Sequence, residues 1–97
     1  MMYGTVARMR IKPGKEADLL AMNEEGTSDV QGMVFQHVYR LDAAENEYML
    51  VVGFTNKEAY VANANSPEMH ENYLAYRELL ESDPEWNDGE VIHSSGL

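Results

Sequence analysis

One stretch of the sequence combines a proton acceptor and a fixed positive charge on one flank of a predicted helix. His70 and Arg77 lie seven residues apart, so they share that flank, with Leu74 and Glu81 along it. Histidine can remove the proton of a phenol near neutral pH, and arginine can hold the resulting anion. The flank borders a stripe with helical spacing that would supply an apolar wall: Met69, Tyr73, Tyr76 and Leu80. This combination is what the oxidation of a phenol requires.

The same helix also has a purely structural interpretation. Arg77 and Glu81 stand four residues apart, a spacing that commonly gives an exposed ion pair on a helix. His70 would then be half exposed, and the aromatic stripe would be ordinary core packing. The sequence leaves both interpretations open.

A second histidine, His37, alternates with Phe35 and Tyr39 along one face of a predicted strand, so we expect it to be partly buried. It is either a general base in a pocket or a buried histidine hydrogen-bonded across the sheet. His37, His70 and His93 do not have the spacing of a metal-binding pair, and the chain contains no cysteine. We therefore expect no metal site.

The predicted interior is rich in methionine and tyrosine, with seven Met and six Tyr residues. Such side chains either pack as a core or line a cavity for a flat aromatic ligand. Trp86, in an acidic segment after the helix, either closes this pocket or fixes the segment to the helix. The candidate lining residues are Met9, Phe35, Met69, Tyr73, Tyr76 and Trp86.

The elements that must position these residues follow from the alternation of apolar residues and from helix-start signals. Asn56 and Ser66-Pro67 are typical beginnings of helices, and Pro84 ends the second of these. The pattern predicts strands at 3–11, 32–41, 47–54 and 90–93, with a helix at 15–25 and a broken helix between the last two strands. This is the βαββαβ order of a ferredoxin-like α+β fold, a four-stranded antiparallel sheet with helices on one face. We expect residues 1–97 to form one domain.

The strand at 47–54 is apolar on both faces. Tyr48, Leu50, Val52 and Phe54 point one way, and Met49, Val51 and Gly53 point the other. A strand of this kind is expected to be covered on both sides. Helices cover one side, and in a chain this short we expect a second copy to cover the other, where Val34 joins the patch. The pattern predicts a homodimer.

The charge balance excludes two classes of partner. Seven Lys and Arg residues against seventeen Asp and Glu residues give a net charge of -10, which argues against nucleic acid and anionic membranes. The sequence has no apolar run of membrane-spanning length and no signal peptide pattern, so we expect a cytoplasmic protein.

Several residues resemble the antibiotic biosynthesis monooxygenase family along nearly the whole chain. They are Pro13-Gly14-Lys15, Gly32, Tyr39-Arg40, Tyr48, Asn56-Lys57-Glu58-Ala59 and Ser66-Pro67. The resemblance implies a dimer in which two sheets pack face to face as a dimeric α+β barrel. It also implies a ligand cavity between the sheet and the helices of each subunit.

The resemblance implies one of several activities. Some members oxidise electron-rich phenols or quinols with O2 and without metal or flavin, and others degrade haem. The positions that carry Asn, Trp and His in the haem-degrading branch correspond here to Ala7, Asn63 and Tyr73, and the common Glu-x-Trp is replaced by Val52-Gly53-Phe54. The resemblance thus places Ala7 beside the cavity and implies no cofactor.

Two functions of different classes follow. The first is a cofactor-independent monooxygenase acting on a small aromatic or quinol-like substrate, with His70, Arg77 and His37 as candidate catalytic residues. The second is a non-catalytic dimeric domain of the same fold that binds a small apolar ligand. The polar flank of the helix favours the first, and the loss of Glu-x-Trp favours the second.

Overall fold

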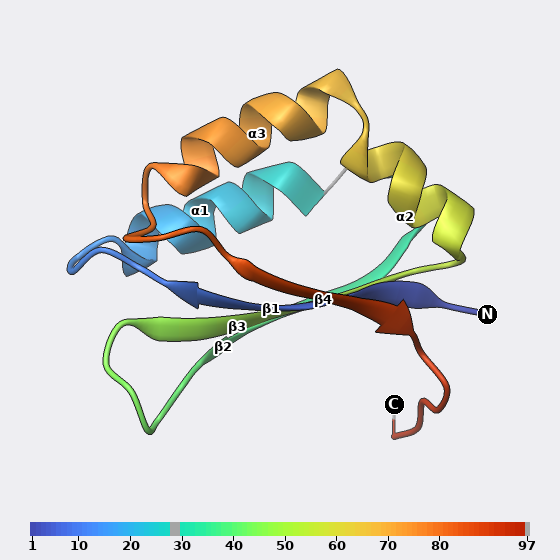
Figure 1. Cartoon of the computed structure of the whole chain (residues 1–97), viewed down its shortest axis with the longest axis horizontal. Coiled ribbons are helices and arrows are strands. Elements are labelled where there is room, and N and C mark those ends of the chain that lie inside the picture. The colour runs from blue at the N-terminus through green and yellow to red at the C-terminus, as the bar shows by residue number, and fades with distance from the viewer. Residues whose placement is uncertain (28–29, 97) are drawn as a thin grey trace.

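The computed structural model describes residues 1–27 and 30–96, and in it three helices cover one face of a four-stranded sheet (Figure 1). The sheet order is β2-β3-β1-β4, and every pairing between neighbouring strands is antiparallel. The predicted ferredoxin-like α+β fold is confirmed. In chain order the elements are β1 (Tyr3–Arg10), α1 (Glu16–Thr27), β2 (Met33–Arg40), β3 (Glu47–Phe54), α2 (Lys57–Ala64), α3 (Pro67–Arg77) and β4 (Glu85–Glu90).

The core lies between the sheet and the helices. Alternate residues of β1 and β3 point toward the helices, as their period-two patterns predicted. We call this side of the sheet the helix face and the opposite side the outer face. The buried core residues are Ala7, Met9, Ile11, Leu19, Tyr48, Leu50 and Leu80.

The two helices after β3 begin where their caps predicted. The side chain of Asn56 accepts a hydrogen bond from the backbone N–H of Ala59 at 2.8 Å. The hydroxyl of Ser66 accepts one from the N–H of Met69 at 3.1 Å, with Pro67 in the first helical turn. Each cap satisfies an N–H group that has no partner within its own helix.

Helix α3 ends at Arg77, several residues earlier than predicted, because the following backbone joins the sheet edge. The N–H of Glu81 donates to the carbonyl of Arg10 at 2.9 Å, and the N–H of Lys12 donates to the carbonyl of Leu79 at the same distance. Leu80 forms a bridge with Ile11 and is buried. Long-range pairing therefore replaces the last helical turn that the apolar stripe predicted.

The last strand is β4, so the prediction of a strand at 90–93 was wrong. β4 pairs with β1 in a register that sets Trp86 opposite Ala7 and Glu90 opposite Tyr3. Trp86 thus belongs to a strand and not to a linker. The acidic residues, Asn87 and Gly89 are poor strand formers, and pairing with β1 overrides that preference.

A register shift changes which residues of β2 face the helices. The irregularity lies between Met33 and Phe35, so Met33 pairs with Phe54 while Phe35 pairs with Gly53. Phe35, His37 and Tyr39 therefore lie on the outer face. The predicted partial burial of His37 was wrong, because this side chain is exposed and its ring stacks on Phe35 at 5.7 Å.

Gly53 fits under the ring of Phe35. A Cβ atom at this position would lie 2.2 Å from a ring carbon of Phe35. Only glycine lets the ring lie against the strand, so Gly53 and Phe35 form one packed unit on the outer face.

Candidate functional site

A cavity of about 780 Å³ lies between the helix face of the sheet and the three helices. That volume is within the range of pockets that hold small organic ligands. Residues from all seven elements contribute to it. Its apolar wall includes Met33, Leu50, Val52, Phe54, Met69 and Tyr73.

The structure brings together five of the residues that the sequence singled out. His70, Met69, Tyr73 and Tyr76 line the cavity from α3, as the helical stripe and its flank predicted. Trp86 lines it from β4, although the reason differs from the predicted one, since the residue reaches the cavity by strand pairing with β1. The imidazole of His70 is exposed at the cavity.

The remaining candidates lie elsewhere. Ala7 and Met9 are fully buried in the core and do not line the cavity. Phe35 and His37 are on the outer face, across the sheet from the cavity. The prediction that Met9 and Phe35 line the same pocket as the helical stripe was therefore wrong, for Phe35 because of the register shift and for Met9 because core side chains cover it completely.

Arg77 makes polar contacts at the end of α3 and is not among the described residues lining the cavity. Its Nε donates to Oδ1 of Asp83 at 2.7 Å, and its Nη1 donates to the carbonyl of Leu80 at 3.0 Å. The guanidinium thus links the end of α3 by hydrogen bonds to the segment that leads into β4. Its partner is Asp83, and not Glu81 as the helical spacing predicted.

Tyr60 contributes a polar group that sequence reasoning missed. Its hydroxyl donates to Oδ1 of Asp88 at 2.8 Å, and its ring packs edge-on against Tyr3 and Phe54. Burial, and then the hydrogen bond to Asp88, raise the pKa of Tyr60 to about 12, while the nearby Thr5 hydroxyl acts in the opposite direction. Tyr60 therefore stays neutral across the physiological range.

A second polar group lies between α1, β2 and α3. The amide of Gln36 donates to Oδ1 of Asn23 at 2.9 Å, and Asn23 donates to the carbonyl of Leu19 at 3.1 Å. Next to Asn23 is the hydroxyl of Tyr76. Burial raises the pKa of Tyr76 to about 12, and the Asn23 amide opposes that rise.

The sequence could have indicated Thr5 as a polar residue facing the interior. It is the one polar side chain among the alternate residues Tyr3, Thr5, Ala7, Met9 and Ile11, apart from the tyrosine hydroxyl. Asp88 gave no such indication, because β4 itself was predicted in the wrong place. Within residues 1–27 and 30–96, no group of three or more His, Asp or Glu side chains is arranged to hold a metal ion.

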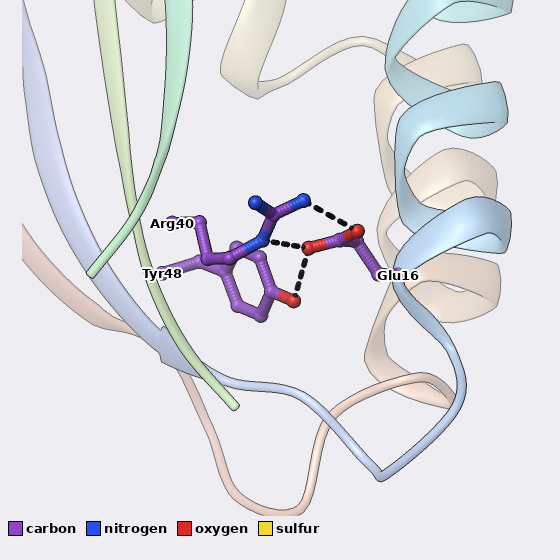
Figure 2. A network of polar contacts seen from close by, with 3 residues as sticks. All are labelled: Glu16, Arg40 and Tyr48. Carbon is purple, nitrogen blue, oxygen red and sulfur yellow. Dashed lines mark hydrogen bonds and ion pairs between the residues drawn. The ribbon is translucent and has the colours of Figure 1, made fainter. Parts of the chain in front are cut away.

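A separate polar network lies outside the cavity and joins α1 to the β2–β3 hairpin (Figure 2). Nε and Nη2 of Arg40 donate to the two carboxylate oxygens of Glu16, the second at 2.7 Å, and the hydroxyl of Tyr48 donates to the same carboxylate at 2.7 Å. Hydrogen bonds from Arg40 and then from Tyr48 lower the pKa of Glu16 to about 2. The network gives Arg40 and Tyr48 a structural role.

The sequence pattern of one family, antibiotic biosynthesis monooxygenase, matches residues 2–72, which is more than half of the chain. The chain belongs to the antibiotic biosynthesis monooxygenase family. The matched region contains three of the four strands that line the cavity, helices α1 and α2 and the first part of α3, and β4 lies outside it. No curated protein sequence matches the chain.

Several solved structures share the fold. A protein from Chloroflexus aurantiacus J-10-fl, named as an antibiotic biosynthesis monooxygenase, is 22% identical with a TM-score of 0.82 over 99% of this chain and 98% of its own. SnoaB, a cofactor-independent oxygenase from Streptomyces nogalater, is 16% identical with a TM-score of 0.81 over 96% and 95% of the two chains. At these identities the likeness supports the fold and not an activity. Among the described helices, none combines the length and apolar character needed to cross a membrane.

Proposed function

We propose that this protein is a cofactor-independent monooxygenase that oxidises a small electron-rich aromatic molecule of the anthrone or quinol type. The observation that carries the proposal is the position of His70 at a cavity of about 780 Å³ with an aromatic and apolar wall. A base beside an apolar wall is an arrangement that can make and hold a reactive aromatic anion. SnoaB, which shares the fold, is a cofactor-independent oxygenase, and the proposal extends that reaction class to this chain by fold analogy alone.

In the proposed reaction the substrate supplies the electrons. His70 takes a proton from the substrate, and the anion passes one electron to O2, giving a substrate radical and superoxide. These two combine into a peroxide anion at the carbon that was the CH2 group, and the His70 imidazolium returns its proton to give the hydroperoxide. The hydroperoxide loses water to leave a carbonyl, so that one oxygen atom enters the product and the other leaves as H2O.

The positive charge beside the substrate anion is the imidazolium that forms on His70. Arg77 was the sequence-based candidate for this role, but its guanidinium donates to Asp83 and to the carbonyl of Leu80. We therefore assign proton removal and charge compensation to one residue, His70. His37, on the outer face, has no part in this scheme.

The test of this proposal is the oxygen-consumption rate of the His70→Ala variant with an anthrone substrate. Loss of the general base should lower kcat by about 10²- to 10⁴-fold. KM should change little, because the aromatic wall provides most of the contact area. The matched control is His93→Gln, which alters an exposed histidine outside the strands and helices. Equal rates for the parent and His70→Ala would show that the base is elsewhere.

A second function, a non-catalytic ligand-binding domain, is favoured by the engagement of Arg77 with Asp83. No Lys or Arg among the described lining residues offers a permanent charge to a bound anion. If the parent protein binds anthrone-type molecules but consumes O2 only at the background rate, this second function is correct.

We also propose that the protein assembles as a homodimer through the outer face of its sheet. Partly buried and exposed apolar side chains gather there, including Val6, Phe35, Met49 and Val51. A second copy of the same face is complementary to such a surface.

A further inference from the structure

The wall of the cavity carries a negative charge and no permanent positive one. Among the described lining residues, Asp88 supplies a carboxylate, and neither lysine nor arginine contributes. The chain that forms α3 and β4 is acidic as well, since residues 66–90 contain eight Asp and Glu residues and one arginine. That arginine, Arg77, is paired with Asp83. We therefore expect a negative electrostatic potential in the cavity, which attracts cations and repels anions.

The carboxylate of Asp88 keeps hydrogen-bonding capacity for a ligand. Tyr60 donates its hydroxyl hydrogen to Oδ1 at 2.8 Å, whereas two carboxylate oxygens can accept about four hydrogen bonds. None of the ion pairs among the described residues involves Asp88. Lys57, at the start of α2, lies over the ring of Tyr3 instead. Because the Asp88 side chain is exposed, a molecule in the cavity can reach it.

Aromatic rings lie on either side of this carboxylate. Trp86 and Asp88 are alternate residues of β4, so both point to the helix face, about 7 Å apart. Trp86 lines the cavity and is 43% exposed. Tyr60 lines it from α2 and bonds to Asp88. Aromatic rings attract cations through their negative faces, so a carboxylate between two rings is an arrangement that binds an ammonium group.

Filling the cavity changes the surroundings of Asp88. A ligand displaces water from the carboxylate, and a charge that loses water without gaining a partner is costly. An anionic ligand would increase this cost, and a hydroxyl would offset it with one hydrogen bond. An ammonium group offsets it with hydrogen bonds and with the opposite charge. The rest of the wall is largely apolar, including Met33, Leu50 and Val52, so it suits the rings of the same ligand.

We infer that the cavity takes an aromatic molecule that carries a protonated amine, and that Asp88 binds its ammonium group beside the rings of Trp86 and Tyr60. Asp88 then determines specificity and takes no part in proton removal, which belongs to His70. Because it takes the cavity as the substrate site, this assignment rests on the proposed function. It deepens that function by adding a positive charge to the electron-rich aromatic substrate.

The test compares three probes that share a naphthalene ring and differ in charge. 2-Naphthylmethylamine is a cation at neutral pH, 2-naphthylmethanol is a neutral molecule of nearly the same shape, and 2-naphthoate is an anion. Isothermal titration calorimetry gives the Kd of each probe. The parent should bind the amine about 10-fold more tightly than the alcohol, because a hydrogen bond to an opposite charge is stronger than a neutral one. It should bind the carboxylate more weakly than either.

Three variants locate the preference for the amine over the alcohol. Asp88→Asn keeps an acceptor for Tyr60 but removes the charge, so the preference should fall from about 10-fold to about twofold or less. Trp86→Leu keeps an apolar side chain but removes the ring, so the preference should fall about two- to fourfold. Glu71→Gln removes the same charge at an exposed position of α3, outside the described lining, and should leave the preference unchanged. Damage to the fold would weaken both probes alike and leave their ratio intact.

Salt provides a second readout that does not depend on a substitution. Raising NaCl from about 20 mM to about 500 mM should weaken binding of the amine and leave binding of the alcohol nearly constant. Equal affinities of the parent for the amine and the alcohol would overturn the inference. So would a preference for the amine that survives Asp88→Asn, or a parent that binds none of the three probes.

The ammonium site and the proposed oxygenase fail separately. A preference for the amine that depends on Asp88, with anthrone oxidised only at the background rate, would refute the oxygenase and leave the ammonium site standing. Oxygen consumption that depends on His70, with equal binding of the three probes, would refute the ammonium site and leave the oxygenase standing.

Discussion

Among single residues, Tyr60 shows how burial and an acidic neighbour act together in the cavity. Its pKa of about 12 arises first from burial and second from the hydrogen bond to Asp88. The unfolded chain has the ordinary tyrosine pKa near 10. Because the folded pKa is the higher one, the stability that this residue contributes is complete below pH 10 and is lost as the pH rises toward 12.

Asp88→Asn should lower the pKa of Tyr60 while leaving it above 10, because the larger cause, burial, is unchanged. The measurement is the absorbance at 295 nm during alkaline titration, with Tyr60→Phe made in both backgrounds to isolate this one phenol. Asp42→Asn, at an exposed position in the turn between β2 and β3, is the matched control and should leave the titration unaltered. A Tyr60 pKa that does not move in Asp88→Asn would contradict the role given to the hydrogen bond.

The cavity residues divide into those that sequence could find and those that it could not. Met69, Tyr73 and Tyr76 were predictable because helical periodicity alone places them on one side of α3. Asp88 and the true position of Phe35 were not, since one depends on the register of β4 against β1 and the other on an irregularity in β2. Long-range pairing fixes both, and local pattern does not encode it.

Among the elements, the starts of α2 and α3 were more predictable than the end of α3 and the position of β4. The caps at Asn56 and Ser66 are local chemistry, and both act as predicted. The end of α3 and the position of β4 depend on contacts between Ile11 and Leu80 and between β1 and β4, more than 65 residues apart in the chain. Local sequence patterns encode the helix caps but not these long-range pairings.

The Glu16 network is the clearest tie between elements, and its effect should depend on pH. The folded pKa of Glu16 is about 2, below its ordinary value of 4.5, because Arg40 and Tyr48 donate hydrogen bonds to the carboxylate (Figure 2). A lowered pKa means that the stabilisation is present above pH 4.5 and is lost as the pH falls toward 2. The carboxylate is partly exposed, so added salt should weaken the effect.

Glu16→Gln should therefore be less stable than the parent at pH 6, and the difference should shrink as the pH falls from about 4.5 to 2. Urea unfolding midpoints across this range provide the measurement, with Glu71→Gln on the exposed side of α3 as the control. A gap between parent and Glu16→Gln that stays constant down to pH 2 would show that the ion pair contributes no pH-dependent stability.

For the whole molecule, the central question is what covers the outer face. Val6 lies opposite Val51 in the pairing of β1 with β3, and Met49 lies opposite Tyr39 of β2, so apolar side chains from three strands meet there. The ion pair of Arg8 with Glu47, at 3.0 Å, adds a charged group at one end of the apolar group. An apolar centre with a polar edge is the usual anatomy of a protein interface.

The parent protein should accordingly be a homodimer at micromolar concentration, with twice the 11.0 kDa mass of one chain by light scattering. Val51→Asp should raise the dimer dissociation constant by about 10²- to 10³-fold, because it buries an unpaired charge at the centre of the interface. Val6→Asp tests the same contact at a site that is 38% exposed in the single chain, so it should separate the subunits while the circular dichroism spectrum stays native.

Leu74→Asp places the same charge at a 54% exposed position on α3, away from the sheet, and should leave the dimer intact. A parent mass of one chain, or dimers of equal strength in all three variants, would mean that the outer face is not where two copies meet.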